Sequence, residues 1–145
     1  IFTGDAFGLA FPLFAGDVPF VFPSSTPTDF DPAEARLSLD KIMATGATTA
    51  YPTHFGAIKN PEAVPVQMRE HLDTYEKLLN TAIASDLTGD ALALMCRAEL
   101  DTWARTQIAR LNMQYTDDVA ATLEMDLRGN ALGIAWQAEK RRPTT

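Results

Sequence analysis

The chain has 145 residues, of which 46% are hydrophobic and 21% charged, so it is one globular domain or a piece of one rather than a disordered segment. A net charge of −7 argues against a nucleic-acid-binding surface, because phosphate binding needs clustered Lys and Arg side chains. No apolar run in this sequence is long enough to span a membrane, and we expect no signal segment. The one cysteine, Cys96, excludes an intrachain disulfide and predicts a reducing, cytoplasmic location.

The chain opens on a short strand followed by a long aromatic loop. Residues 1–4 predict a buried strand, in which Gly4 allows close backbone approach directly before Asp5. Residues 6–30 are rich in Phe and Pro, and so many aromatic side chains predict an ordered segment. Two interpretations of this loop stay open: a segment that packs on the core, or the wall of a substrate pocket beside Asp5.

A helix and a second strand follow the loop. Asp31 predicts a helix N-cap, a proline follows at the first helical position, and the helix is expected to end near Thr45. Residues 48–53 predict the second strand, which ends at His54. Strand, helix and strand in this order predict a crossover unit with parallel strands. Because parallel strands end at the same edge of a sheet, Asp5 and His54 are expected to share one site.

The remainder of the chain has a helical pattern. Residues 57–65, with two prolines, are expected to form a connector. Beyond them, apolar residues recur at steps of three and four, interrupted at 85–89 and at 112–116, which predicts three long helices. We therefore expect an α/β core part at 1–60 and a helical region at 61–145 that packs on or beside it.

Asp5 and His54 carry the candidate chemistry. A carboxylate and an imidazole delivered by two strand ends suit zinc or iron. A lone His at a strand end is more often a structural hydrogen-bonding group, so the ligand interpretation depends on the two residues occurring together. His71 is expected to be a partly buried, hydrogen-bonded side chain, and Cys96 a core thiol rather than a nucleophile.

Two motifs resemble a known family. Gly4-Asp5 after one strand, and Thr53-His54-Phe55-Gly56 after the next, resemble the last two metal-ligand motifs of the metallo-β-lactamase-fold hydrolases, closest to the branch with glyoxalase II-like dinuclear sites. Residues 130–136 resemble the last helix of many such hydrolases. The family's earlier His-x-His-x-Asp-His motif and a further His are absent from this chain. The resemblance therefore implies the C-terminal half of such a hydrolase, with an α/β fold that is part of an αββα sandwich.

The resemblance also implies a mechanism. Asp5 would bridge two divalent metal ions, with zinc favoured over iron or manganese, and His54 would bind one of them. A metal-bound hydroxide would then attack a carbonyl or phosphoryl centre of a small-molecule substrate. Thioester, lactone, β-lactam and phosphodiester substrates are all open.

The start of the chain at Ile1, inside the first strand and without an initiator Met, predicts a fragment, a cleaved product or a subunit. The missing strands and ligands are expected from a longer parent or from a companion chain, and a homo-oligomer is also open. The alternative function is a catalytically inactive helical interaction module, whose amphipathic helices bury against a partner. Metal content of the purified chain would separate the two functions.

Overall fold

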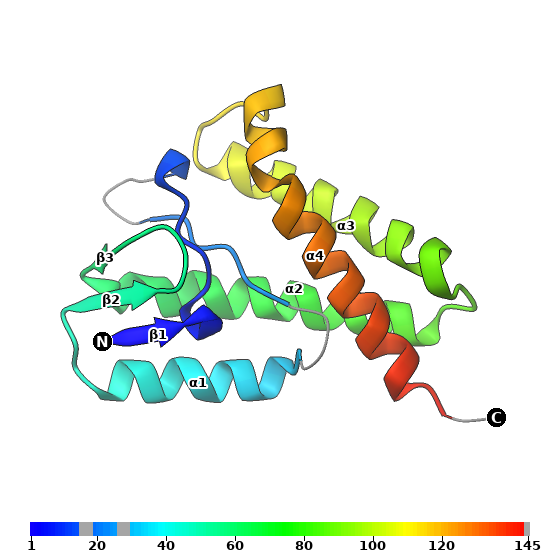
Figure 1. The fold of residues 1–145 in the computed structure, drawn as a ribbon, viewed down its shortest axis with the longest axis horizontal. Helices are drawn as coiled ribbons and strands as arrows, with labels where there is room; N and C mark the ends of the chain where they lie inside the picture. Colours follow the sequence, from blue (N-terminus) through cyan, green and yellow to red (C-terminus); the bar gives the residue numbers. More distant parts are fainter. Residues whose placement is uncertain (15–18, 26–29, 144–145) are drawn as a thin grey trace. The chain divides into compact units, whose positions relative to one another are not determined.

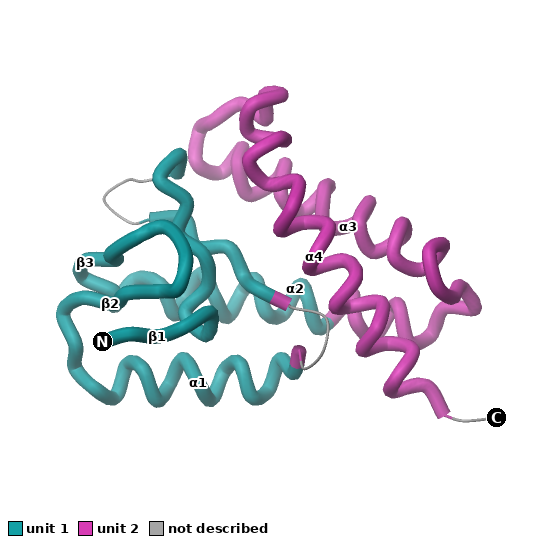
Figure 2. Tube along the Cα trace, in the orientation of Figure 1, with its two compact units in different colours: residues 1–24, 31–76 teal, residues 25–30, 77–145 magenta. Residues whose placement is uncertain are grey.

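The computed structural model describes residues 1–14, 19–25 and 30–143, which form a mixed α/β structure that is mostly helical (Figure 1). The chain divides into two compact units (Figure 2). Unit 1 contains Ile1–Ser24 and Asp31–Glu76, and unit 2 contains Ser25–Phe30 and Lys77–Thr145. None of the helices in the described part of the chain is both long and apolar enough to cross a membrane.

Unit 1 is built on a three-stranded sheet in the order β1 (Phe2–Gly4), β2 (Thr49–Pro52), β3 (Ile58–Lys59). β1 and β2 are parallel and are joined through helix α1 (Pro32–Ala44), which confirms the predicted crossover unit. The Asp31 carboxylate caps α1 by accepting from the backbone N–H groups of Ala33 and Glu34, at 2.9 and 3.2 Å. The αββα sandwich stays a prediction, because the described residues contain this one small sheet.

Two expectations about the sheet are wrong. β1 is not buried: it lies at the sheet edge, and the side chain of Phe2 is 87% exposed. Residues 57–65 are not a plain connector, since they contain β3, which pairs antiparallel with β2, and a short 3-10 helix at Pro61–Ala63. Positive φ angles at Phe55 (72°) and Gly56 (94°) turn the chain back after β2, and this reversal allows the added strand.

The aromatic loop buries most of its described residues, as its many aromatic side chains predict, while Ala6, Pro12 and Leu13 are exposed; residues 15–18 and 26–29 lie outside the described residues. Five Phe side chains of this loop in unit 1 are at most 5% exposed: Phe7, Phe11, Phe14, Phe20 and Phe22. All of these except Phe7 make edge-to-face ring contacts with one another. Backbone hydrogen bonds of 2.8 Å in both directions pair Leu9 with Phe22. Gly8 is required here, because a Cβ atom would lie 2.5 Å from the Val21 side chain and 2.8 Å from the Phe22 carbonyl oxygen.

The boundary between the units falls inside helix α2 (Val64–Ala84), whereas the change of pattern in the sequence predicts a division at residue 60. The first half of α2 is tied to other parts of unit 1 by polar contacts. Gln67 accepts from the N–H of Val21 at 3.0 Å and donates to the carbonyl of Pro19 at 2.8 Å. Arg36 of α1 forms ion pairs with Asp73 (2.6 Å) and Glu76 (2.7 Å). These long-range contacts, and not a break in the helix, set the limit of unit 1.

Unit 2 contains the end of α2, from Lys77, together with α3 (Gly89–Arg110) and α4 (Asp117–Arg141), so the three predicted long helices are confirmed. Apolar side chains of α3 and α4 form its core, among them the fully buried Leu92, Leu100, Ile108, Leu123 and Leu127. The N–H of Ser25 donates to the Asn130 side-chain oxygen at 2.7 Å, and the Ser25 hydroxyl donates to the Asn130 carbonyl at 3.1 Å. This pair of buried bonds fixes the chain before α1 onto α4.

Candidate functional site

The register of β1 and β2 brings the two candidate metal ligands together. The N–H of Tyr51 donates to the carbonyl of Ile1 at 2.8 Å, and the N–H of Thr53 donates to the carbonyl of Gly4 at 3.2 Å. Asp5 directly follows β1 and His54 lies two residues beyond the end of β2, so both follow the same edge of the sheet. Gly4, at φ 58° and ψ −145°, turns the chain from β1 into the short 3-10 helix Asp5–Phe7.

The side chains of Asp5 and His54 face each other without bonding. Nε2 of His54 lies 3.9 Å from Oδ1 of Asp5, too far for a hydrogen bond. The two side chains are 44% and 54% exposed, and within the described ranges neither forms a hydrogen bond. One carboxylate oxygen and one imidazole nitrogen are therefore free to bind the same ligand from solvent.

The segment after His54 is held in an uncommon conformation. Phe55 has a φ of 72°, a region that bulky residues rarely adopt. Its ring stacks on Phe11 of the aromatic loop, with centroids 4.4 Å apart and planes at 26°. This contact anchors the turn that presents His54. Strained backbone conformations cost free energy, and they are found most often at functional positions. It also places Phe11 of the aromatic loop against the residue that follows His54, while the pocket-wall interpretation stays a prediction.

The donor chemistry fits a divalent metal ion as part of a larger set. Two ligand atoms of one tetrahedral zinc ion lie about 3.3 Å apart at ordinary zinc–ligand distances of about 2.0–2.1 Å. The 3.9 Å separation is close to that value, and exposed side chains can close the difference by small rotations. Zinc takes four ligands, however, and the described residues contain no group of three or more His, Cys, Asp or Glu side chains placed to hold a metal.

The other two titratable candidates have structural positions. His71 is 3% exposed, its Nδ1 lies 3.2 Å from the Val21 carbonyl oxygen, and its ring packs near Phe20, as expected for a buried, hydrogen-bonded His. Cys96 is fully buried, and burial raises the pKa of its thiol to about 11, which confirms a core thiol rather than a nucleophile.

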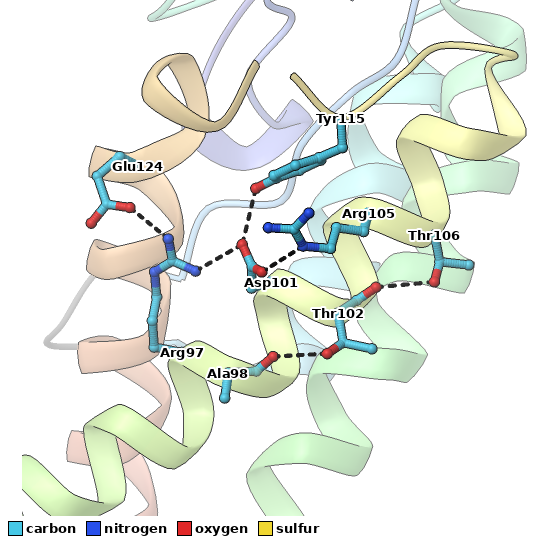
Figure 3. Close-up of polar contacts among 8 residues, drawn as sticks. All are labelled: Arg97, Ala98, Asp101, Thr102, Arg105, Thr106, Tyr115 and Glu124. Carbon is cyan, nitrogen blue, oxygen red and sulfur yellow. Dashed lines mark hydrogen bonds and ion pairs between the residues drawn. The ribbon is translucent and has the colours of Figure 1, made fainter. Parts of the chain in front are cut away.

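A polar cluster on unit 2 was not predicted from the sequence (Figure 3). Asp101 accepts hydrogen bonds from Arg97 (3.3 Å), Arg105 (2.8 Å) and the hydroxyl of Tyr115 (3.0 Å). Arg97 also pairs with Glu124 of α4, and the Arg105 guanidinium lies 4.1 Å from the centre of the Tyr115 ring. The Arg97–Asp101–Arg105 spacing of four residues signals an ion-pair row on one helix face, but nothing local points to Tyr115. Each charged side chain of the cluster has a partner of opposite charge within it. These contacts join α3 to α4 and, through Tyr115, to the segment between the two helices.

Comparison with protein-family models, with curated proteins and with solved structures finds no match for this chain. The positions of Asp5 and His54 at the ends of two parallel strands therefore carry the functional argument.

Proposed function

We propose that this chain supplies two ligands, Asp5 and His54, to the metal centre of a metal-dependent hydrolase with a metallo-β-lactamase-like fold. The observation that carries the proposal is the 3.9 Å approach of Nε2 of His54 to Oδ1 of Asp5 at the common edge of β1 and β2. Both side chains are exposed there, and neither is engaged in a hydrogen bond with another described residue. The motif resemblance, in the order Gly-Asp and then Thr-His-Phe-Gly, supports the same assignment.

A bound divalent ion, zinc being favoured, would supply an activated water and stabilise negative charge on a carbonyl or phosphoryl group. Asp5 contributes two carboxylate oxygens, which allow it to contact more than one ion. His54 would contribute Nε2, and a hydrogen-bonding partner for its Nδ1 would have to come from outside the described residues to fix the tautomer. Phe11 and Phe55, stacked beside His54, would limit water on that side of a small-molecule substrate.

The edge of the sheet indicates where the missing ligands would enter. β1 is an edge strand, so the backbone groups on its outer side have no strand partner in the described sheet. Phe2 and Tyr51 are cross-strand neighbours on one face of the sheet, with rings 5.3 Å apart and exposures of 87% and 43%. An additional strand parallel to β1 would end beside Asp5 and could deliver further ligands there. The remainder of a longer parent or a companion chain would supply that strand.

Zinc titration followed by NMR of the histidine ring nitrogens tests the proposal directly. The chain has two histidines, so the spectrum contains one candidate ligand, His54, and one internal control, His71. We expect zinc to shift the His54 signals and to leave His71 unchanged. Asp5→Ala and Asp5→Asn should weaken zinc binding at His54 by about tenfold, because one of two ligands is lost or made a poorer donor.

The matched control is Asp86→Ala, which removes an exposed carboxylate in the connection between α2 and α3, within unit 2. A zinc response at His71 alone, or a His54 response that Asp5→Ala leaves unaltered, would contradict the assignment. Absence of any zinc response at His54 would favour the second candidate, a helical interaction module. The exposed apolar side chains Leu94, Met125 and Trp136 on α3 and α4 are the observation in favour of that module.

A further inference from the structure

One face of the α3–α4 pair in unit 2 carries exposed apolar side chains around an open hollow. Leu94 of α3 is 69% exposed, and Met125, Leu132 and Trp136 of α4 are 76%, 43% and 41% exposed. Leu94 and Leu132 both line the hollow, whose volume is about 480 Å³. Met125, Leu132 and Trp136 follow one another at steps of seven and four residues, so they lie along one stripe of α4. Large exposed side chains gathered in this way mark a contact surface.

Charged side chains border this apolar face. Asp90, Arg97, Glu124 and Arg128 also line the hollow. Arg97 is already engaged, at 2.5 Å from Glu124 and 3.3 Å from Asp101. Within the described ranges, Asp90 and Arg128 form no ion pair or side-chain hydrogen bond. One free carboxylate and one free guanidinium therefore flank the apolar centre.

The free charges are placed symmetrically about the apolar centre. α3 and α4, side by side in Figure 1, are antiparallel: the N–H of Gly89 at the start of α3 donates to Glu139 near the end of α4 at 2.7 Å. Asp90 precedes Leu94 by four residues on α3, and Arg128 precedes Leu132 by four residues on α4. Four residues correspond to about 6 Å along a helix and return to the same face. Asp90 and Arg128 thus lie at opposite ends of the Leu94–Leu132 pair, at similar distances from it.

We propose that this face binds the same face of a second copy of the chain, around a two-fold axis that passes between Leu94 and Leu132. An acidic end, an apolar centre and a basic end become self-complementary under a two-fold rotation. The rotation brings Arg128 of each copy opposite Asp90 of the other copy, so that each free charge gains a partner of opposite sign. The pairing does not depend on metal binding at Asp5 and His54.

The available area is sufficient for a weak dimer. α3 and α4 have 22 and 25 residues, about 33 and 37 Å in length. Two such helices packed at an interaxial distance of roughly 10 Å present a face of about 600–700 Å² per copy, near the lower limit for specific association. The net charge of −7 on each copy opposes the pairing, so the dimer should strengthen with added salt up to the point where the Arg128–Asp90 pairs are screened.

Substitutions that reverse the charges at Arg128 and Asp90 test the two-fold geometry. Sedimentation velocity over a range of chain concentrations measures the dimer dissociation constant of each variant. The measurements use the full chain with Phe2→Lys, which blocks association through β1, and a chelator, which removes metal-bridged species. Arg128→Glu and Asp90→Arg should each raise the dimer dissociation constant about tenfold or more. In either variant, residue 128 of one copy faces a like charge at residue 90 of the other copy, and this repulsion occurs at two symmetry-related places in the dimer. The double variant restores opposite signs and should return within about threefold of the parent. Leu94→Asp should give a monomer, and Leu37→Asp, on exposed Leu37 of α1 in unit 1, should have no effect.

A second measurement remains valid even if the charge variants do not fold. Leu132→Cys places a thiol next to the proposed axis, and mild oxidation should then link two copies in high yield, since Cys96 is buried. Leu37→Cys is the exposed control and should link slowly. A Phe2→Lys chain that stays monomeric at millimolar concentration would overturn the proposal. So would a double charge variant no tighter than the single variants, or equal linking yields from the two cysteine variants.

Discussion

At the scale of single residues, the contacts of Asp101 show how burial and hydrogen bonding compete. Partial burial by itself would raise the pKa of Asp101, but hydrogen bonds from Arg105, Tyr115 and Arg97 outweigh it and hold that pKa below the ordinary aspartate value. Burial, with the hydrogen bond to Asp101, raises the pKa of Tyr115 to about 12. Asp101 is therefore ionised and Tyr115 neutral across the physiological range, and their hydrogen bond is charge-assisted.

This pair has a pH-dependent effect on stability. A carboxyl whose folded-state pKa is lowered stabilises the fold above its unfolded pKa of about 4, and this contribution is lost as the pH falls through the lower folded value. Tyr115→Phe should therefore cost about 1–2 kcal/mol of unfolding free energy at pH 7, because Asp101 loses a donor. The cost should shrink as the pH falls through the lowered pKa of Asp101 and the carboxyl becomes protonated.

Thermal and urea unfolding at pH 7 and at a series of acidic pH values measure this difference. Tyr51→Phe is the matched control, because the Tyr51 hydroxyl has no hydrogen-bond partner in the described part of the chain. Equal destabilisation by the two substitutions at pH 7 would contradict a specific role for the Tyr115–Asp101 bond.

At the scale of elements, α1 determines the geometry of the candidate site. As the crossover between β1 and β2 it makes those strands parallel, and so it brings Asp5 and His54 to one edge. The Asp31 carboxylate satisfies two N–H groups in the first turn of α1, and ion pairs from Arg36 to Asp73 and Glu76 tie the helix to α2. The position of the site thus depends on a helix that contributes no residue to it.

Asp31→Ala should lower the unfolding free energy by about 1 kcal/mol, the usual cost of removing a helix cap. Asp31→Asn keeps an oxygen acceptor and should cost clearly less. Chemical denaturation compares the two variants, and the zinc response of His54 reports the site. We expect the affinity for zinc to be unchanged in the folded fraction of each variant. Equal losses of stability for Ala and Asn would show that the cap bonds are not what Asp31 contributes.

At the scale of the whole molecule, the two units differ in how completely their secondary-structure elements are paired and covered. In unit 1 the sheet stops at β1, whose outer edge has no strand partner among the described residues and whose Phe2 is 87% exposed. Three strands of two to four residues form a small sheet, which is marginal without a further strand or covering layer. In unit 2, α3 and α4 enclose a continuous apolar core.

We therefore expect the chain alone to aggregate through unit 1. Phe2→Lys places a charge on the edge strand, which disfavours the pairing of edges between molecules. Light scattering over time should show at least severalfold slower aggregation for Phe2→Lys than for the parent. Val66→Lys, which changes an exposed side chain of α2, is the control and should aggregate like the parent. An aggregation rate that Phe2→Lys leaves unaltered would show that β1 is not the route.

The sequence by itself determined the elements whose signals are local. Asp31 and the proline after it marked the start of α1, and the recurrence of apolar residues at three and four positions marked α2, α3 and α4. The order strand, helix, strand was enough to predict parallel β1 and β2, because the handedness and reach of a crossover leave few alternatives. It also predicted that Asp5 and His54 would meet, since parallel strands end at one edge.

Only the tertiary structure decided the features that depend on contacts between distant residues. The two-residue strand β3 exists because Phe55 and Gly56 reverse the chain at positive φ, and the Phe55 conformation is held by a ring 44 positions earlier, Phe11. The exposure of β1, the Tyr115–Asp101 bond and the boundary inside α2 likewise follow from what packs against each segment. Local patterns report the preferences of neighbouring residues, whereas burial and pairing are set by long-range packing that no short window of sequence contains.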